Sequence, residues 1–217
     1  MRSVLLALVL LAVAAPAAEA APTITVKLAR ADVTFGRAAS VTGVLTAYTP
    51  LAGQVVVLEG QRKFLGPFHP LASSVTDASG AYAFKPKLDR NYRLRVVVPA
   101  LGISSRVVRV YTFPAFRLTF QALKPRVVRL TQRYTVPRDV RLTTPTFFYL
   151  GPRKAKLSQL RVRGKTRRVR PGHYRSRVTV ALPAAWNGRF RFGSCFHTSR
   201  GTGMGRPDAH CPKRLRF

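Results

Sequence analysis

Both cysteines of the chain and two of its four histidines lie in one stretch, in the order Cys195, His197, His210 and Cys211. These residue types can hold zinc, but zinc ligands usually come in pairs separated by two to four residues, and adjacent ligands at 210 and 211 fit a tetrahedron badly. Cys195 could also act as a nucleophile beside His197, yet no carboxylate or amide that would orient the imidazole can be identified. The spacing therefore favours a disulfide between Cys195 and Cys211, and we expect no metal.

The cysteines enclose a glycine-rich run, GTGMG, at residues 201–205. No Lys-Ser or Lys-Thr follows these glycines, and Pro207 opposes a helix, so the run does not match a phosphate-binding loop. We predict that GTGMG is the flexible middle of a closed loop.

The densest run of charge is RVRGKTRRVRPGHYRSR, residues 161–177, with eight cations and no acid. Arginine binds phosphate or sulfate groups in a bidentate manner, so the run predicts a polyanion-binding hairpin. The alternative is a solvated face, because charge runs are commonly only exposed. The candidate binding residues are Arg161, Arg163, Lys165, Arg167, Arg168, Arg170, Arg175 and Arg177.

The N-terminus has the layout of a secretory signal peptide over residues 1–20. Arg2 precedes an apolar run at residues 4–15, and Ala18-Glu19-Ala20 supplies a small-x-small cleavage site. The apolar run is shorter than the roughly 20 residues that span a bilayer. We therefore expect a secreted or extracytoplasmic protein associated with the cell envelope, in a compartment where two cysteines pair.

Charge is concentrated in the second half of the chain. The whole sequence has 38 basic and 7 acidic residues, a net +31, and residues 114–217 hold 25 of the bases and only 2 of the acids. Nucleic acid is the usual partner of such a surface, but export argues against a regulatory DNA-binding role, and no helix-turn-helix, zinc finger or RNA-binding motif appears. The expected partner is an anionic cell-envelope polymer, anionic lipid headgroups or extracellular DNA.

Apolar residues alternate with polar ones along most of the chain, which predicts strands that are buried on one face. In RNYRLRVVV, for example, Tyr92, Leu94, Val96 and Val98 share one face. Frequent proline and glycine separate short strands, as in β-sandwiches. The sequence therefore predicts an all-β fold of two tandem antiparallel Ig-like β-sandwiches, at residues 21–113 and 114–217.

The second half is predicted to be a basic sandwich that ends in the disulfide loop. Trp186 precedes an Asn-Gly turn and is expected to pack against the core. The expected strands cover residues 116–123, 126–134, 146–150, 157–163, 174–182 and 189–196.

The segments ASVTGVLTA, PLAGQVVVLEG and SVTDASGAYAFKPKLDRNYRLRVVV, within residues 33–110, resemble bacterial Ig-like and carboxypeptidase regulatory-like modules of secreted proteins. Asp77 and Gly80 suit a tight turn, and Tyr82 and Phe84 would point together into a sandwich core. The resemblance implies a spacer or binding module and no catalytic residues. The second half resembles no family.

These features predict an exported, non-catalytic binding or structural protein whose second half holds anionic surface polymers electrostatically. A membrane-active cationic protein of the antimicrobial or toxin type remains an alternative. A secreted hydrolase is less favoured, because the second half has only Asp139 and Asp208 as acids, whereas acid-base catalysis often uses paired carboxylates.

Overall fold

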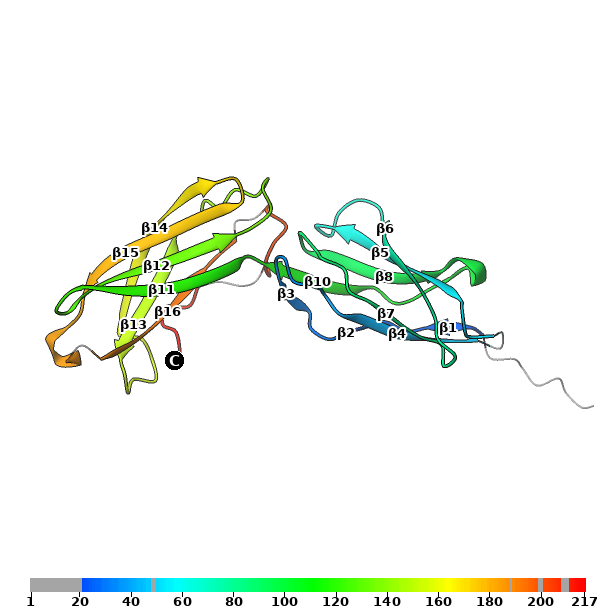
Figure 1. Cartoon of the computed structure of the whole chain (residues 1–217), viewed down its shortest axis with the longest axis horizontal. Coiled ribbons are helices and arrows are strands. Elements are labelled where there is room, and N and C mark those ends of the chain that lie inside the picture. Colours follow the sequence, from blue (N-terminus) through cyan, green and yellow to red (C-terminus); the bar gives the residue numbers. More distant parts are fainter. Residues whose placement is uncertain (1–20, 48–49, 188, 199–200, 208–210) are drawn as a thin grey trace, which may run out of the picture.

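The computed structural model describes residues 21–47, 50–187, 189–198, 201–207 and 211–217. The predicted signal peptide, His210 and Asp208 lie outside the described residues. The described residues form sixteen strands and two short 3-10 turns, η1 (Pro99–Leu101) and η2 (Ala184–Trp186), so the predicted all-β fold is confirmed. None of the helical segments in the described ranges could cross a membrane. Figure 1 shows the strands gathered in two lobes that follow each other along the chain.

The first lobe contains two sheets that enclose one core. One sheet has the order β1-β4-β2 with β7 paired to β4, and the other has the order β3-β10-β8-β5-β6 with β9 paired to β8. All pairings are antiparallel except that of β3 with β10. The strands are β1 (Thr23–Ile24), β2 (Lys27–Leu28), β3 (Asp32–Thr34), β4 (Val41–Thr46), β5 (Val55–Arg62), β6 (His69–Val75), β7 (Ala81–Phe84), β8 (Tyr92–Val98), β9 (Ile103–Ser104) and β10 (Val108–Phe113).

Local sequence explains this core. Every second residue of β8 is buried, in the phase that the alternation predicts. Tyr82 and Phe84 are both buried and their ring centroids are 5.7 Å apart, so their shared inward direction is confirmed. The Asp77 carboxylate accepts hydrogen bonds from the backbone N–H of Ser79 and Ala81, and Gly80 has φ +77°, which confirms the predicted turn.

The second lobe is one antiparallel sheet of six strands in the order β11-β12-β15-β14-β13-β16. Its core includes Leu130, Phe148, Leu150 and the predicted core residue Trp186. The strands lie within a few residues of their predicted positions, except at β14. They are β11 (Ala115–Lys124), β12 (Val127–Thr135), β13 (Thr146–Pro152), β14 (Leu160–Arg170), β15 (His173–Ala181) and β16 (Phe190–Phe196).

Strand β14 changes partner at Gly164. Its residues up to Gly164 pair with β13, and its residues from Lys165 onward pair with β15. A Cβ on Gly164 would stand 2.4 Å from the Phe148 ring and 2.6 Å from the Ser176 Oγ, so only glycine fits this crossing. The predicted strand end at residue 163 is therefore wrong: Gly164 lets β14 pass close to the core and continue.

The disulfide loop of the second lobe docks on the first lobe. Cys195 and Cys211 form the predicted disulfide, with Cα atoms 5.4 Å apart. The backbone N–H of Asn91 donates to the Gly203 carbonyl at 2.6 Å, and the Asn91 side chain donates to the Gly205 carbonyl at 2.7 Å. The prediction of a flexible loop middle is therefore wrong for these glycines, because the first lobe holds their backbone. Such a disulfide is typical of an oxidising environment outside the cytoplasm.

A buried arginine makes a second tie between the lobes. Arg90 is 1% exposed, and its guanidinium donates to the Asp139 carboxylate at 2.5 Å and to the Asp89 carbonyl at 2.8 Å. Arg206 of the disulfide loop pairs with Asp32 of β3 at 2.9 Å. Since Pro114 alone separates β10 from β11, the linker and these contacts fix the lobes closely together.

Candidate polyanion-binding face

Four arginines lie directly opposite one another across four strands of the second lobe. The register pairs Arg117 of β11 with Arg133 of β12, Arg133 with Arg175 of β15, and Arg175 with Arg167 of β14. We call Arg117, Arg133, Arg175 and Arg167 the arginine row. All four side chains are exposed.

Three further cations extend the row into a basic face. Two residues after Arg175 on β15, Arg177 lies opposite Lys165 of β14 and Thr131 of β12. Two residues further along the same face, Arg129 of β12 lies opposite Thr179 of β15. The basic face consists of Arg117, Arg129, Arg133, Lys165, Arg167, Arg175 and Arg177.

Strand alternation explains why these side chains point outward. In β12, Leu130, Gln132 and Tyr134 are buried, so the residues between them must lie on the other face. In β15, Tyr174 and Ser176 are buried in the same way, and the arginines beside them are exposed. The hydrophobic core thus fixes the direction of each arginine on these strands.

The cations of the basic face repel one another. The pKa of Arg177 is lowered from its ordinary value, first by the charge of Arg175, then by desolvation and by the charges of Arg129 and Arg133. The Nε of Arg129 is buried and has no hydrogen-bond partner in the described part of the chain. Neighbouring strands lie about 4.8 Å apart, which is less than the screening length of about 8 Å at physiological salt. Solvent ions therefore screen this repulsion only in part.

None of the carboxylates in the described ranges pairs with the basic face. Four of them, Asp32, Glu59, Asp89 and Asp139, form ion pairs with arginines that do not belong to it. The fifth, Asp77, accepts hydrogen bonds within its own turn. Among the described residues, the basic face therefore has no internal counter-charge.

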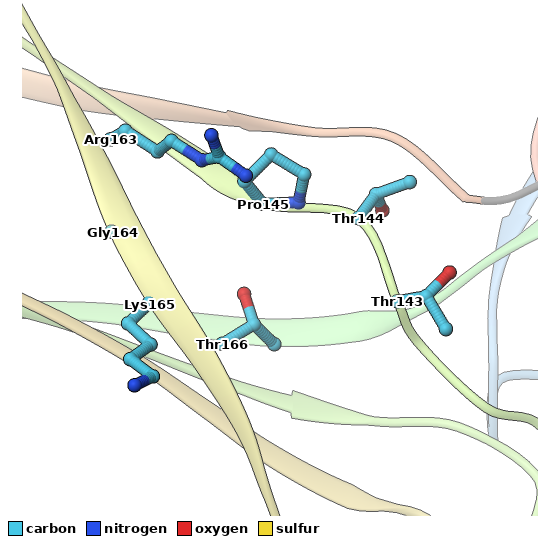
Figure 2. Close-up of a pocket in the computed structure, with 7 residues that line it drawn as sticks. All are labelled: Thr143, Thr144, Pro145, Arg163, Gly164, Lys165 and Thr166. Carbon is cyan, nitrogen blue, oxygen red and sulfur yellow. The ribbon is translucent and has the colours of Figure 1, made fainter.

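Two hollows border the basic face. A groove is lined by Lys165, Arg167, Arg175, Arg177, Val178 and Thr179. A pocket of ≈ 390 Å³ lies where β14 leaves β13, and Figure 2 shows the residues around it. Lys165 lines both hollows, so both border this residue of β14.

The predicted binding residues divide among three places. Lys165, Arg167, Arg175 and Arg177 lie on the basic face. Arg161 and Arg163 lie on the part of β14 that pairs with β13, and the Arg161 guanidinium stands 3.8 Å from the centre of the Phe147 ring. The remaining two, Arg168 and Arg170, lie at the end of β14 and outside the basic face. Arg168 is opposite the buried Tyr174, and Arg170, which follows a register shift, is opposite His173.

Sequence reasoning missed three members of the basic face, Arg117, Arg129 and Arg133. They lie on β11 and β12, at least 28 residues before the predicted hairpin. Alternation assigns each of them to the polar side of its own strand. The pairing of β12 with β15, which brings them beside the hairpin, has no local signal.

The groups considered for catalysis or metal binding do not come together in the described residues. Asp139 is engaged with Arg90 at the junction of the lobes. No three His, Cys, Asp or Glu side chains in the described ranges are grouped so that they could hold a metal ion. His210 and Asp208 lie outside those ranges.

No protein-family model matches the chain, and no curated protein matches it. The resemblance of residues 33–110 to bacterial Ig-like and carboxypeptidase regulatory-like modules stays a prediction.

Proposed function

We propose that the protein is exported and binds an anionic polymer of the cell envelope through the basic face, without catalysis. The observation that carries this proposal is the arginine row, four guanidinium groups opposite one another on four strands. In this proposal the first lobe, with its Ig-like resemblance, serves as a spacer or second binding module.

The arginine row favours binding over a merely solvated surface. Like charges directly opposite on a sheet are destabilising, so a face that served only solubility would gain from interspersed acids. Here three direct arginine pairs follow one another, and no described carboxylate relieves them. An anionic polymer would relieve this repulsion and accept bidentate hydrogen bonds from each guanidinium.

The shape of the face suits an extended polymer better than a small ligand. The row crosses three gaps between strands, or roughly 14 Å, and it lies on the exposed face of the sheet. An array of this length offers several binding points in succession. We therefore favour a chain with regularly repeated anionic groups over a single small anion.

Binding to isolated envelopes tests the proposal. The row variant carries Arg117→Gln, Arg133→Gln, Arg167→Gln and Arg175→Gln. The control variant loses the same charge from the first lobe, through Arg30→Gln, Arg37→Gln, Arg106→Gln and Arg109→Gln, all of which are exposed.

We expect wild type and control to bind envelopes and to elute at similar salt, and the row variant to elute at much lower salt. Equal losses in both variants would mean that net charge alone governs retention, and the proposal would fail. Envelopes stripped of wall polymer, and vesicles of anionic lipid, distinguish the polymer from lipid headgroups. Leakage of the vesicles would instead favour the membrane-active alternative.

A further inference from the structure

The split of β14 from β13 leaves a strand edge without a partner. The pairing of β13 with β14 ends at Thr146 and Gly164. From Lys165 to Arg170, β14 pairs with β15 alone among the described strands. Backbone N–H groups on such an edge are free to donate to a ligand.

The pocket of ≈ 390 Å³ described above lies at this split, and we call it the β14 pocket. Figure 2 shows the Arg163 guanidinium beside Pro145, with the Thr143 and Thr166 side chains on the same side of β14. The Lys165 side chain extends to the other side of the strand, and Lys165 also lines the groove. The lining includes two cations and no acid; the residues are Thr143, Thr144, Pro145, Arg163, Gly164, Lys165 and Thr166.

Hydroxyl groups gather around this pocket. The Thr166 Oγ1 lies 3.3 Å from the Thr146 Oγ1, a long contact, whereas the Thr144 hydroxyl already donates to the His197 carbonyl. Close to Gly164, the buried Ser176 Oγ has no hydrogen-bond partner among the described residues. Ser176 and Thr146 do not line the pocket; its own lining combines the Arg163 guanidinium with the side chains of Thr143, Thr144 and Thr166.

We infer that the β14 pocket is a subsite for one phosphate or sulfate ester group, together with part of the sugar or polyol that carries it. Arginine and hydroxyl donors suit the oxygens of such a group. A volume of ≈ 390 Å³ lies in the range of small-molecule sites and exceeds the need of a bare ion. Threonine hydroxyls can accept hydrogen bonds as well as donate them, which suits the hydroxyl groups of an adjoining sugar. This inference rests on the proposed function for the polymer that supplies the group.

Titrating the mature protein, residues 21–217, with glycerol phosphate tests the subsite, with backbone amide NMR shifts as the readout. We expect shifts concentrated at residues 143–144 and 163–166. Arg163→Gln should weaken binding roughly tenfold, because it removes a charge-assisted hydrogen bond. Arg161→Gln is the matched control, since Arg161 lies on the same strand but does not line the pocket, and it should leave the affinity unchanged. A parallel titration with a sulfated monosaccharide shows whether the pocket prefers a phosphate or a sulfate ester. A titration with acetate shows whether a carboxylate also binds there.

The row variant separates this inference from the proposed function. If it still binds glycerol phosphate like wild type, the subsite stands whatever happens to polymer binding. Shifts spread over the basic face and lost in the row variant would overturn the subsite, and so would equal affinity in the Arg163→Gln variant. If the subsite fails while the row variant still loses envelope binding, the proposed function survives alone.

Discussion

Replacing Arg133 by glutamine should make the protein more stable and a poorer binder. Arg133 has an arginine directly opposite on each side, Arg117 and Arg175. Two unit charges about 7 Å apart in water repel by roughly 0.6 kcal/mol, and screening at 0.15 M salt lowers this to about 0.3 kcal/mol. Removing both repulsions should raise the free energy of unfolding by about 1 kcal/mol at very low salt and by about 0.5 kcal/mol at 0.15 M.

Urea and thermal unfolding at 10 mM, 150 mM and 1 M salt measure this effect. At low salt we expect a gain in Tm of about 2–4 °C for a chain of this length, shrinking as salt rises. Arg133→Lys keeps the charge and should show no gain, and the remote Arg37→Gln should be neutral. If Arg133→Gln instead lowers stability at low salt, Arg133 makes a favourable interaction in the free protein, and the repulsion argument is refuted.

Three further predictions concern the junction and the crossing strand. Replacing Cys195 and Cys211 by serine should lower the free energy of unfolding by about 3 kcal/mol, because the disulfide reduces the chain entropy of the unfolded state by about this amount for a loop of this size. Urea unfolding measures the loss; if there is none, docking on the first lobe is enough to hold the loop. The hydrogen bond from Arg90 holds the pKa of Asp139 below its ordinary value. The ionised Asp139 carboxylate therefore contributes fully to the free energy of unfolding above its unfolded pKa of about 3.9, and this contribution is lost as pH falls through the lower folded pKa. Asp139→Asn should therefore lower stability at neutral pH and flatten this part of the acid unfolding curve; an unchanged curve would count against the tie. Gly164→Ala should cost about 1–3 kcal/mol because its Cβ would meet the two side chains described above, and a neutral result would mean that β14 can shift.

The alternation of apolar residues was enough to predict most of the strands, and in β8 and β15 it also predicted the buried face. In β11 it did not, because Phe116 and Phe120 are 64% and 53% exposed. Tyr82 and Phe84 of β7 are buried as expected, because burial in a strand depends on period two, which is local. Trp186 is also buried as expected, although it lies in the 3-10 turn η2. The cysteine pair was also predictable, because the chain has only two cysteines and the predicted export would place them where cysteines pair.

The basic face itself was only half predictable. Which arginines meet depends on the pairing of β12 with β15, whose paired residues are 38 to 54 positions apart in the sequence. The sequence predicts a strand end before Gly164 because glycine usually interrupts a strand, whereas here glycine permits close passage over Phe148. The docking of Gly203 and Gly205 on Asn91 could not be inferred, because it depends on the placement of two separate lobes.

The salt dependence of binding tests the central claim most directly. A fluorescent single-stranded oligonucleotide serves as a model polyphosphate, and anisotropy gives Kd over a range of salt for wild type, row variant and control variant. Each phosphate neutralised on a single strand contributes roughly 0.7 to the slope of log K against log salt. We predict that the row variant loses roughly three units of slope and the control variant close to none. Equal slopes for the two variants would contradict the claim that the arginine row is the binding face.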